Sequence, residues 1–211
     1  MIAEGKVGPQ VLGDGAVTAL RQNRDGALAV QCIHGDFFEA AYRNQQWTAC
    51  TLPAGVNPGA ALSTTPSLTL WNPPVSGKCF VIIKAFMGFI SGTLGAGTTN
   101  WIQNSIAGNQ PAQPTTGTVL VARSNYIGNA AASVGVAQQG ATVATTPVCF
   151  RPCWTFGAMV ISTAVQPVQV VELTDGDILV GPGNFVGLHA IAAVGTSPLI
   201  QYSVTWEECS V

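Results

Sequence analysis

Alternation of apolar and polar positions covers most of the chain after residue 67. Runs rich in β-branched and aromatic residues are separated there by clusters of Gly, Pro, Asn and Thr, which is the pattern of strands joined by turns. This part of the chain has no convincing amphipathic-helix spacing. The predicted strands are Leu68–Trp71, Lys78–Ile90, Thr98–Ile106, Val119–Ser124, Thr155–Ala164, Val168–Leu173, Ile178–Gly181, Asn184–Ala193 and Leu199–Glu207.

Two of these runs indicate how the strands are arranged. Lys78–Lys84 is apolar on both faces, as expected of a central strand that is covered on each side. The last run alternates, which places Tyr202, Val204 and Trp206 on one face. The sequence therefore predicts an all-β fold, an antiparallel jelly-roll-like β-sandwich with an extended N-terminal arm.

The composition changes near residue 50. Nine of the 18 charged residues lie in residues 1–50, which we interpret as an N-terminal arm or small subdomain for attachment. Within it, Leu28–Ile33 is a predicted short strand. Phe37–Arg43 fits either a helical face or a strand, and its aromatic residues favour a strand or extended arm. The sandwich domain is predicted to occupy residues 51–211.

Between Ala85 and Phe150 the chain has 66 residues and one charged side chain, Arg123. Ordinary globular sequences are about a quarter charged, so a surface other than water is expected to cover much of this stretch. Residues 107–147 would be long for a free loop. They form either an ordered insertion against a neighbouring subunit or a mobile excursion, and their lack of charge favours the insertion.

The composition argues against several classes of partner. No uninterrupted run reaches the roughly 20 apolar residues that a membrane-spanning helix needs, so no membrane partner is predicted. The net charge of −2 argues against nucleic acid. The first residues lack a basic segment followed by an apolar one, so we expect synthesis in a host cytoplasm without a signal peptide.

Candidate catalytic and metal-binding groups are few. The chain has two histidines, His34 and His189. His189 lies in an apolar run and is expected to be a hydrogen-bonded core or interface residue. A nucleophile motif of the G-x-S-x-G type is missing, and a cupin-type metal site would need more histidines. Asp175–Asp177 could supply calcium ligands, but an Asp-Gly step between two strands favours a hairpin turn.

The remaining polar and aromatic features favour structural roles. Cys149 and Cys153 are separated by three residues instead of the two of redox and zinc motifs, and the six cysteines are expected to be reduced thiols, with a disulfide framework as the alternative. The pair Glu207 and Glu208 is expected to solvate the end of the last strand. The five tryptophans could form a carbohydrate platform, but their strand positions favour core and interface anchors. We predict no catalytic residue, metal or cofactor.

Several short strings resemble a known group of proteins. Leu68–Lys78, Ser91–Gly97, Gly181–Phe185 and Tyr202–Glu208 resemble sequences of virion structural proteins of tailed bacteriophages. The resemblance is to the capsid cement, decoration or head-fibre type, which are often trimeric jelly rolls. It implies a homotrimer on the capsid surface, with the major capsid protein as a second partner.

The prediction from residues and resemblance together is a non-enzymatic capsid cement or decoration protein that stabilises a viral shell. The alternative is a receptor- or carbohydrate-binding jelly roll of a phage tail or fibre, whose partner would be a glycan. The candidate partner-binding residues are Arg21, Arg24, Asp25, Arg43 and Trp47. The candidate subunit-interface residues are Trp101, Ile102, Arg123 and Tyr126.

Overall fold

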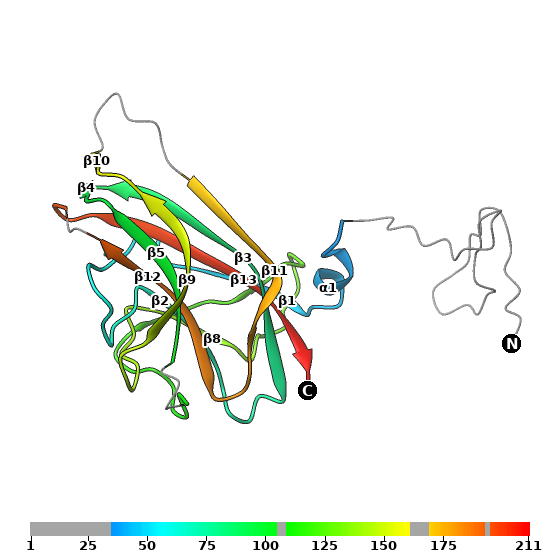
Figure 1. Ribbon diagram of the computed structural model, residues 1–211. Coiled ribbons are helices and arrows are strands. Elements are labelled where there is room, and N and C mark those ends of the chain that lie inside the picture. The colour runs from blue at the N-terminus through cyan, green and yellow to red at the C-terminus, as the bar shows by residue number, and fades with distance from the viewer. Residues whose placement is uncertain (1–34, 105–108, 161–168, 193–194) are drawn as a thin grey trace, which may run out of the picture. The chain divides into compact units, whose positions relative to one another are not determined.

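The computed structural model describes residues 35–104, 109–160, 169–192 and 195–211 (Figure 1). The chain divides into two compact units after Phe38, and the second unit, Glu39–Val211, contains every strand of the described residues. The predicted strand Leu28–Ile33 and His34 lie outside the described residues.

A short helix precedes the first strand. Helix α1, Phe38–Tyr42, lies where a strand or extended arm was predicted, so that prediction is wrong for these residues. The Arg43 amide donates to the Glu39 carbonyl over 2.9 Å, and the Arg43 side chain pairs with the Glu39 carboxylate over 3.2 Å. Two alanines with high helix propensity and this i, i+4 pair outweigh the β preference of the aromatic residues.

Two large antiparallel sheets form the rest of the unit. The first has five strands. Their order across the sheet is β11 (Gln169–Val180), β3 (Lys78–Ser91), β13 (Leu199–Ser210), β1 (Gln46–Cys50) and β7 (Arg123–Ser124). As predicted, the apolar run at Lys78–Lys84 lies in a central strand, because β3 pairs with β11 on one side and with β13 on the other.

The second sheet has six strands. Their order is β6 (Thr118–Leu120), β8 (Val136–Gln139), β2 (Leu68–Asn72), β12 (Asn184–Ala192), β5 (Gly97–Gln103) and β9 (Val148–Phe156). A separate two-stranded ribbon pairs β4 (Thr93–Leu94) with β10 (Met159–Val160).

The strand pairing defines the topology. The first long strand pairs with the last, β1 with β13, and the pairs β2–β12, β3–β11 and β5–β9 are nested inside it. The pairs β3–β13 and β5–β12 then complete the sheets. This nesting of eight strands in two packed sheets is a jelly roll, and the predicted all-β sandwich is confirmed. Since β1 pairs with β13 along its whole length, the sandwich includes residues before the predicted boundary at 50/51.

The hairpin predicted at Asp175–Asp177 is instead a bulge within one strand. The runs 168–173 and 178–181 belong to the single strand β11, and both halves pair with β3 in the same direction. The ladder shifts between Leu173 and Ile178, where Asp175 and Gly176 have φ angles of 47° and 87°. The Asp-Gly step thus adopts the positive φ angles that were expected, but extra residues loop out of an edge strand instead of reversing the chain.

Other strand ends differ from the predicted ones. Strand β9 begins at Val148 instead of Thr155, and Pro152 lies within it. A proline is tolerated there because β9 is an edge strand. The predicted strand at 119–124 is two short strands in different sheets, β6 and β7.

The core lies between the two sheets. Tyr202, Val204 and Trp206 all point into it, which confirms that they share one face. A second cluster of buried residues covers the other face of the six-stranded sheet, because Trp71, Ile102 and Phe185 alternate with neighbours that belong to the main core. Within the described ranges no helix is long and apolar enough to cross a membrane.

Candidate assembly surfaces

The insertion between β5 and β9 covers one edge of the sandwich. Residues 109–147, which we call the insertion, contribute β6 and β8 beyond β2 in one sheet and β7 beside β1 in the other. The same segment therefore extends both sheets at the same edge. It is an ordered part of this chain's own sandwich, where the sequence left an insertion and a mobile excursion open.

A polar network fixes the middle of the insertion, directly after β7, to β1. The Asn125 side chain donates to Gln46 Oε1 over 2.8 Å and accepts from the Thr48 hydroxyl over 2.7 Å. Thr48 also contacts the Thr205 hydroxyl on β13 over 2.9 Å. This network lies on the outer face of the five-stranded sheet, so it fixes the position of the insertion without using core contacts.

A buried carboxylate fixes the segment of the insertion that precedes β8. Glu208 on β13 is 5% exposed, so the expectation that it solvates the end of the strand is wrong. Its Oε1 accepts hydrogen bonds from the Ser133 hydroxyl (2.5 Å) and from the backbone amides of Val134 (3.2 Å) and Gly135 (3.3 Å). The Trp206 indole N–H donates to the same oxygen over 3.3 Å. These donors compensate the cost of burying a charge.

The outer side of the insertion is apolar. We define the insertion surface as Val121, Arg123, Tyr126 and Ile127. All four side chains are exposed, and Ile127 is 93% exposed. The Tyr126 ring stacks on Tyr42, with ring centroids 5.8 Å apart. Arg123 forms no ion pair with any residue in the part of the chain that the structure describes.

A second apolar surface lies at the opposite edge of the sandwich. We define the β11 surface as Val171, Leu173, Asp175 and Leu179 of β11 together with Phe86 of β3. Leu173 and Leu179 are 60% and 64% exposed, and Phe86 lies opposite Val171 in the ladder. Lys84, next to this surface, places its Nζ 5.5 Å from the centre of the Phe86 ring.

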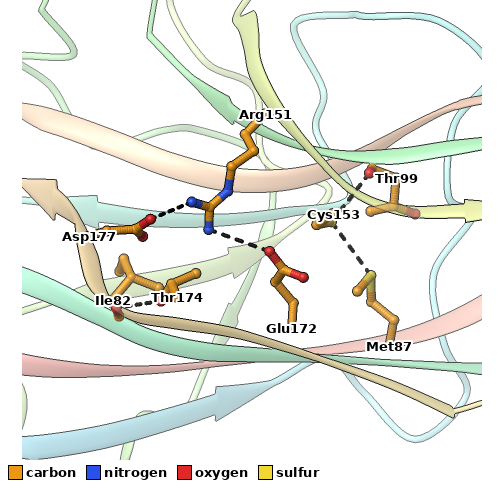
Figure 2. A network of polar contacts seen from close by, with 8 residues as sticks. All are labelled: Ile82, Met87, Thr99, Arg151, Cys153, Glu172, Thr174 and Asp177. Atoms are coloured by element: carbon orange, nitrogen blue, oxygen red, sulfur yellow. Dashed lines mark hydrogen bonds and ion pairs between the residues drawn. The ribbon is translucent and has the colours of Figure 1, made fainter.

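An ion-pair network joins the two sheets beneath the β11 surface. Arg151 on β9 reaches between two carboxylates of β11 (Figure 2), with 2.6 Å to Asp177 and 3.4 Å to Glu172. Asp175, two residues from Asp177, is exposed and forms no ion pair within the described ranges. The bulge therefore leaves one carboxylate without a cationic partner at the rim of an apolar surface.

A groove of about 430 Å³ adjoins the β11 surface on the outer face of the five-stranded sheet. Phe86 and Ile90 form its apolar walls, and Gln201 and Ser203 contribute polar groups. Gly88 lies between the two walls, and a Cβ atom added to it would meet no atom within 4 Å. The missing side chain leaves the groove open.

Both ring nitrogens of His189 form hydrogen bonds with the backbone. Its Nδ1 lies 3.2 Å from the Ser67 amide nitrogen, and its Nε2 lies 2.8 Å from the Ala61 carbonyl oxygen. An amide can only donate and a carbonyl can only accept, so the ring is the neutral tautomer protonated at Nε2. Burial lowers the pKa of His189. The predicted role as a hydrogen-bonded buried histidine is confirmed.

Cys153 is a shielded thiol. Its Sγ lies 3.2 Å from the Thr99 carbonyl oxygen and 3.9 Å from Met87 Sδ (Figure 2). Burial, together with the nearby Glu172 carboxylate, raises the pKa of Cys153 to about 12. Such a thiol is a poor nucleophile at neutral pH. The described residues contain no group of three or more His, Cys, Asp or Glu side chains that could hold a metal ion.

The predicted partner-binding residues differ in their exposure to solvent. Arg43 is exposed, whereas Trp47 is 2% exposed and part of the core. Arg21, Arg24 and Asp25 lie outside the described residues.

The predicted interface residues are also divided. Trp101 and Ile102 are fully buried in the two cores of their own chain, so they cannot reach another subunit from the folded chain. Arg123 and Tyr126 both lie on the insertion surface. The β11 surface was missed, because Leu173 and Leu179 were assigned to two strands of a hairpin instead of to one face of a single strand.

The jelly roll with two apolar edges defines an architecture that many unrelated functions use. No protein-family model matches the chain, and no curated protein or solved structure is similar enough to match it.

Proposed function

We propose that this protein is a structural component of a virus particle, a capsid cement or decoration protein that assembles with copies of itself and stabilises the shell. The observation that carries the proposal is the exposed apolar surface on two opposite edges of one sandwich. Residues 85–150, which include one of these surfaces, have a single charged side chain. Exposed apolar surfaces of this kind mark sites of protein association.

In this role the sandwich and the N-terminal segment bind different partners. The sandwich supplies the contacts between copies, which we propose to form a homotrimer, and burial of the two edges keeps the assembled particle soluble. The N-terminal segment, where half of the charged residues lie, attaches the oligomer to the major capsid protein through Arg21, Arg24 and Asp25. Contacts spread over a large interface then add stability to the shell without any chemical reaction.

The mass of the protein in solution tests the self-assembly. Light scattering after size exclusion should give three times the 21.7 kDa chain mass at micromolar concentration. A well-behaved monomer at that concentration would contradict the proposal. Capsids that lack the protein should bind the full chain in a fixed ratio to lattice positions, and should not bind a chain without residues 1–34, whose oligomer should remain intact.

The alternative function is a receptor- or carbohydrate-binding protein of a phage tail or fibre, and one observation favours it. The stacked Tyr42 and Tyr126 rings are about half exposed, and aromatic faces of this kind can stack on sugar rings. Four of the five tryptophans are buried, so the aromatic platform would consist of tyrosines. Binding to a glycan array that is lost in the Tyr126→Ala variant would support this alternative, and the lack of any glycan binding would exclude it.

A further inference from the structure

We propose that copies of this chain assemble head to tail, with the insertion surface of one copy against the β11 surface of the next and Arg123 paired with Asp175 across the contact. The inference rests on the self-assembly proposed above, but it does not depend on a role in a virus. It commits to a second copy of this chain as the occupant of both surfaces.

The first step is the position of the two surfaces. The insertion surface lies where β6 and β7 end the two sheets, and the β11 surface lies at the other end of the five-stranded sheet. A twofold contact with its axis through either surface pairs that surface with itself and leaves the other surface exposed. A head-to-tail contact buries both, and it closes into a ring when the rotation between copies permits.

The second step is charge. Residues 85–150 contain no Asp or Glu, so a twofold contact between insertion surfaces would offer Arg123 no anion. The β11 surface offers Asp175, which lacks an ion pair within the described part of the chain. Asp177 already pairs with Arg151, and Lys84 lies over Phe86. A further carboxylate on this face, Glu207, lies two strands from β11 beside Val81. Charge complementarity therefore favours the head-to-tail contact.

The third step is the way the edge strand is blocked. Strand β11 pairs only with β3 among the described strands, so its other edge could in principle accept a further strand. The bulge between Leu173 and Ile178 and its acidic residues interrupt that edge, which is how natural edge strands avoid continuous pairing. The contact is therefore made by side chains on the outer face, where Val171, Leu173 and Leu179 point.

The fourth step is shape. Ile127 protrudes almost fully exposed from the insertion surface, and the groove above Gly88 adjoins the β11 surface. Asp175 lies near Ile83 in the ladder, so about 16 Å of strand separates it from Gly88 at the usual rise per residue. Ile127 lies in a turn four residues after Arg123, so their backbone separation is less than the roughly 14 Å of an extended chain. The long arginine side chain has to span the remaining distance for Ile127 to enter the groove while Arg123 reaches Asp175.

The test is a double-mutant cycle on the full chain, with the dissociation constant of the oligomer measured by sedimentation equilibrium. Arg123→Glu should weaken assembly about 30-fold or more, because it replaces an ion pair by two like charges. Asp175→Asn should weaken the wild type about 5-fold, and asparagine tolerates the positive φ angle at this position. In the Arg123→Glu background the same change should instead strengthen assembly, because it removes the repulsion.

The reversal of sign is the diagnostic result, because it shows that the two positions are coupled in assembly. Lys78→Glu, a charge reversal at the first residue of β3 and outside both defined surfaces, is the matched control and should leave the dissociation constant unchanged. Gly88→Glu, at a site with room for a side chain, should weaken assembly about 10-fold without loss of folding, as checked by thermal unfolding.

Three outcomes would overturn the inference. If Asp175→Asn has the same effect in both backgrounds, the two residues do not meet. If Arg123→Glu leaves an existing oligomer unchanged, the insertion surface is not in the contact, while the proposed self-assembly survives. If the wild-type chain stays monomeric at all concentrations, the inference and the proposed self-assembly fail together.

Discussion

At the scale of single residues, buried polar side chains explain how this sandwich responds to pH and to reagents. His189 and Cys153 are both shielded by the fold, and each has a pKa that burial moves away from its usual range. For both residues the neutral form is the one that the surroundings stabilise. The protein should therefore resist changes that charge either group.

His189 should make the fold sensitive to acid. Its pKa is lowered in the folded state, so the unfolded chain binds more protons than the folded chain once the pH falls below about 6.5. Stability is then fully present above that pH and decreases on acidification, by at most about 1.4 kcal/mol per pH unit from this residue. Urea unfolding between pH 7.5 and pH 5 should show a shallower loss for His189→Gln than for the wild type.

The matched control is His34→Gln, which removes the other histidine and should keep the wild-type slope. Equal slopes for the wild type and His189→Gln would show that this ring does not resist protonation. The variant is expected to be less stable at every pH, since Ser67 and Ala61 lose a fitted partner, so the slope is the quantity to compare.

Cys149 and Cys153 should differ sharply in reactivity although they lie on the same strand. Cys149 is exposed, whereas a pKa of about 12 keeps Cys153 protonated, and the thiolate is the reactive form. Iodoacetamide at pH 8 should label Cys149 and spare Cys153 in the folded protein, and should label both in urea. Mass spectrometry of the digested protein gives the answer, and equal labelling in the folded state would contradict the described burial.

At the scale of elements, the insertion is the part of the sandwich whose position depends most on specific polar contacts. Its middle part is bound to β1 through Asn125 and, just before β8, to β13 through Glu208. Four donors converge on Glu208 Oε1, and the Gly135 amide among them is shared with the Ser133 hydroxyl oxygen. This carboxylate therefore holds the insertion on the edge of the sandwich.

Glu208→Gln should loosen the insertion and destabilise the protein by about 1–3 kcal/mol, because an amide brings two donors into a site made of donors. Urea unfolding measures the loss, and limited proteolysis should cut residues 125–135 faster than in the wild type. Glu207→Gln is the matched control on the same strand. Its side chain is partly exposed, so its effect should stay within about 0.5 kcal/mol. Comparable losses in the two variants would argue against a special role for Glu208.

The elements also show how far the sequence determines the fold. Alternation with a period of two predicted the strands around Tyr202, Val204 and Trp206, because one face of that strand packs on a single core. It could not distinguish the bulge at Asp175 from a hairpin, since Asp-Gly adopts positive φ in both and only the pairing of each half with β3 decides. The short helix α1 was missed because five residues are too few for a periodic signal.

The candidate site was predicted only in part for a similar reason. The low charge of residues 85–150 directed attention to Arg123 and Tyr126, which lie exposed on the insertion. Trp101 and Ile102 belong to the same stretch but are buried on opposite faces of β5, one in each core. A second core outside the sheets depends on loops far apart in the sequence, and alternation along one strand does not reveal it.

At the scale of the whole molecule, the low charge and the closed sandwich act together. The hydrophobic core between the sheets of the eight-stranded jelly roll is formed within one chain. The apolar side chains that remain exposed are therefore not needed for folding. Some of them are scattered singly, as is ordinary for monomers, but those of the insertion and of β11 lie at two opposite edges of the sandwich. A protein of this kind should gain part of its stability from association.

That gain predicts a melting temperature that depends on protein concentration. If three folded chains associate and the unfolded chains do not, each tenfold rise in concentration stabilises the folded chain by about 0.9 kcal/mol, which corresponds to roughly 2–4 °C for a chain of this length. Scanning calorimetry from 1 to 100 μM should show the shift for the wild type and little or none for Arg123→Glu. A wild-type melting temperature that is independent of concentration would mean that the two apolar edges of this sandwich are not joined to copies of the chain, and that a different partner covers them.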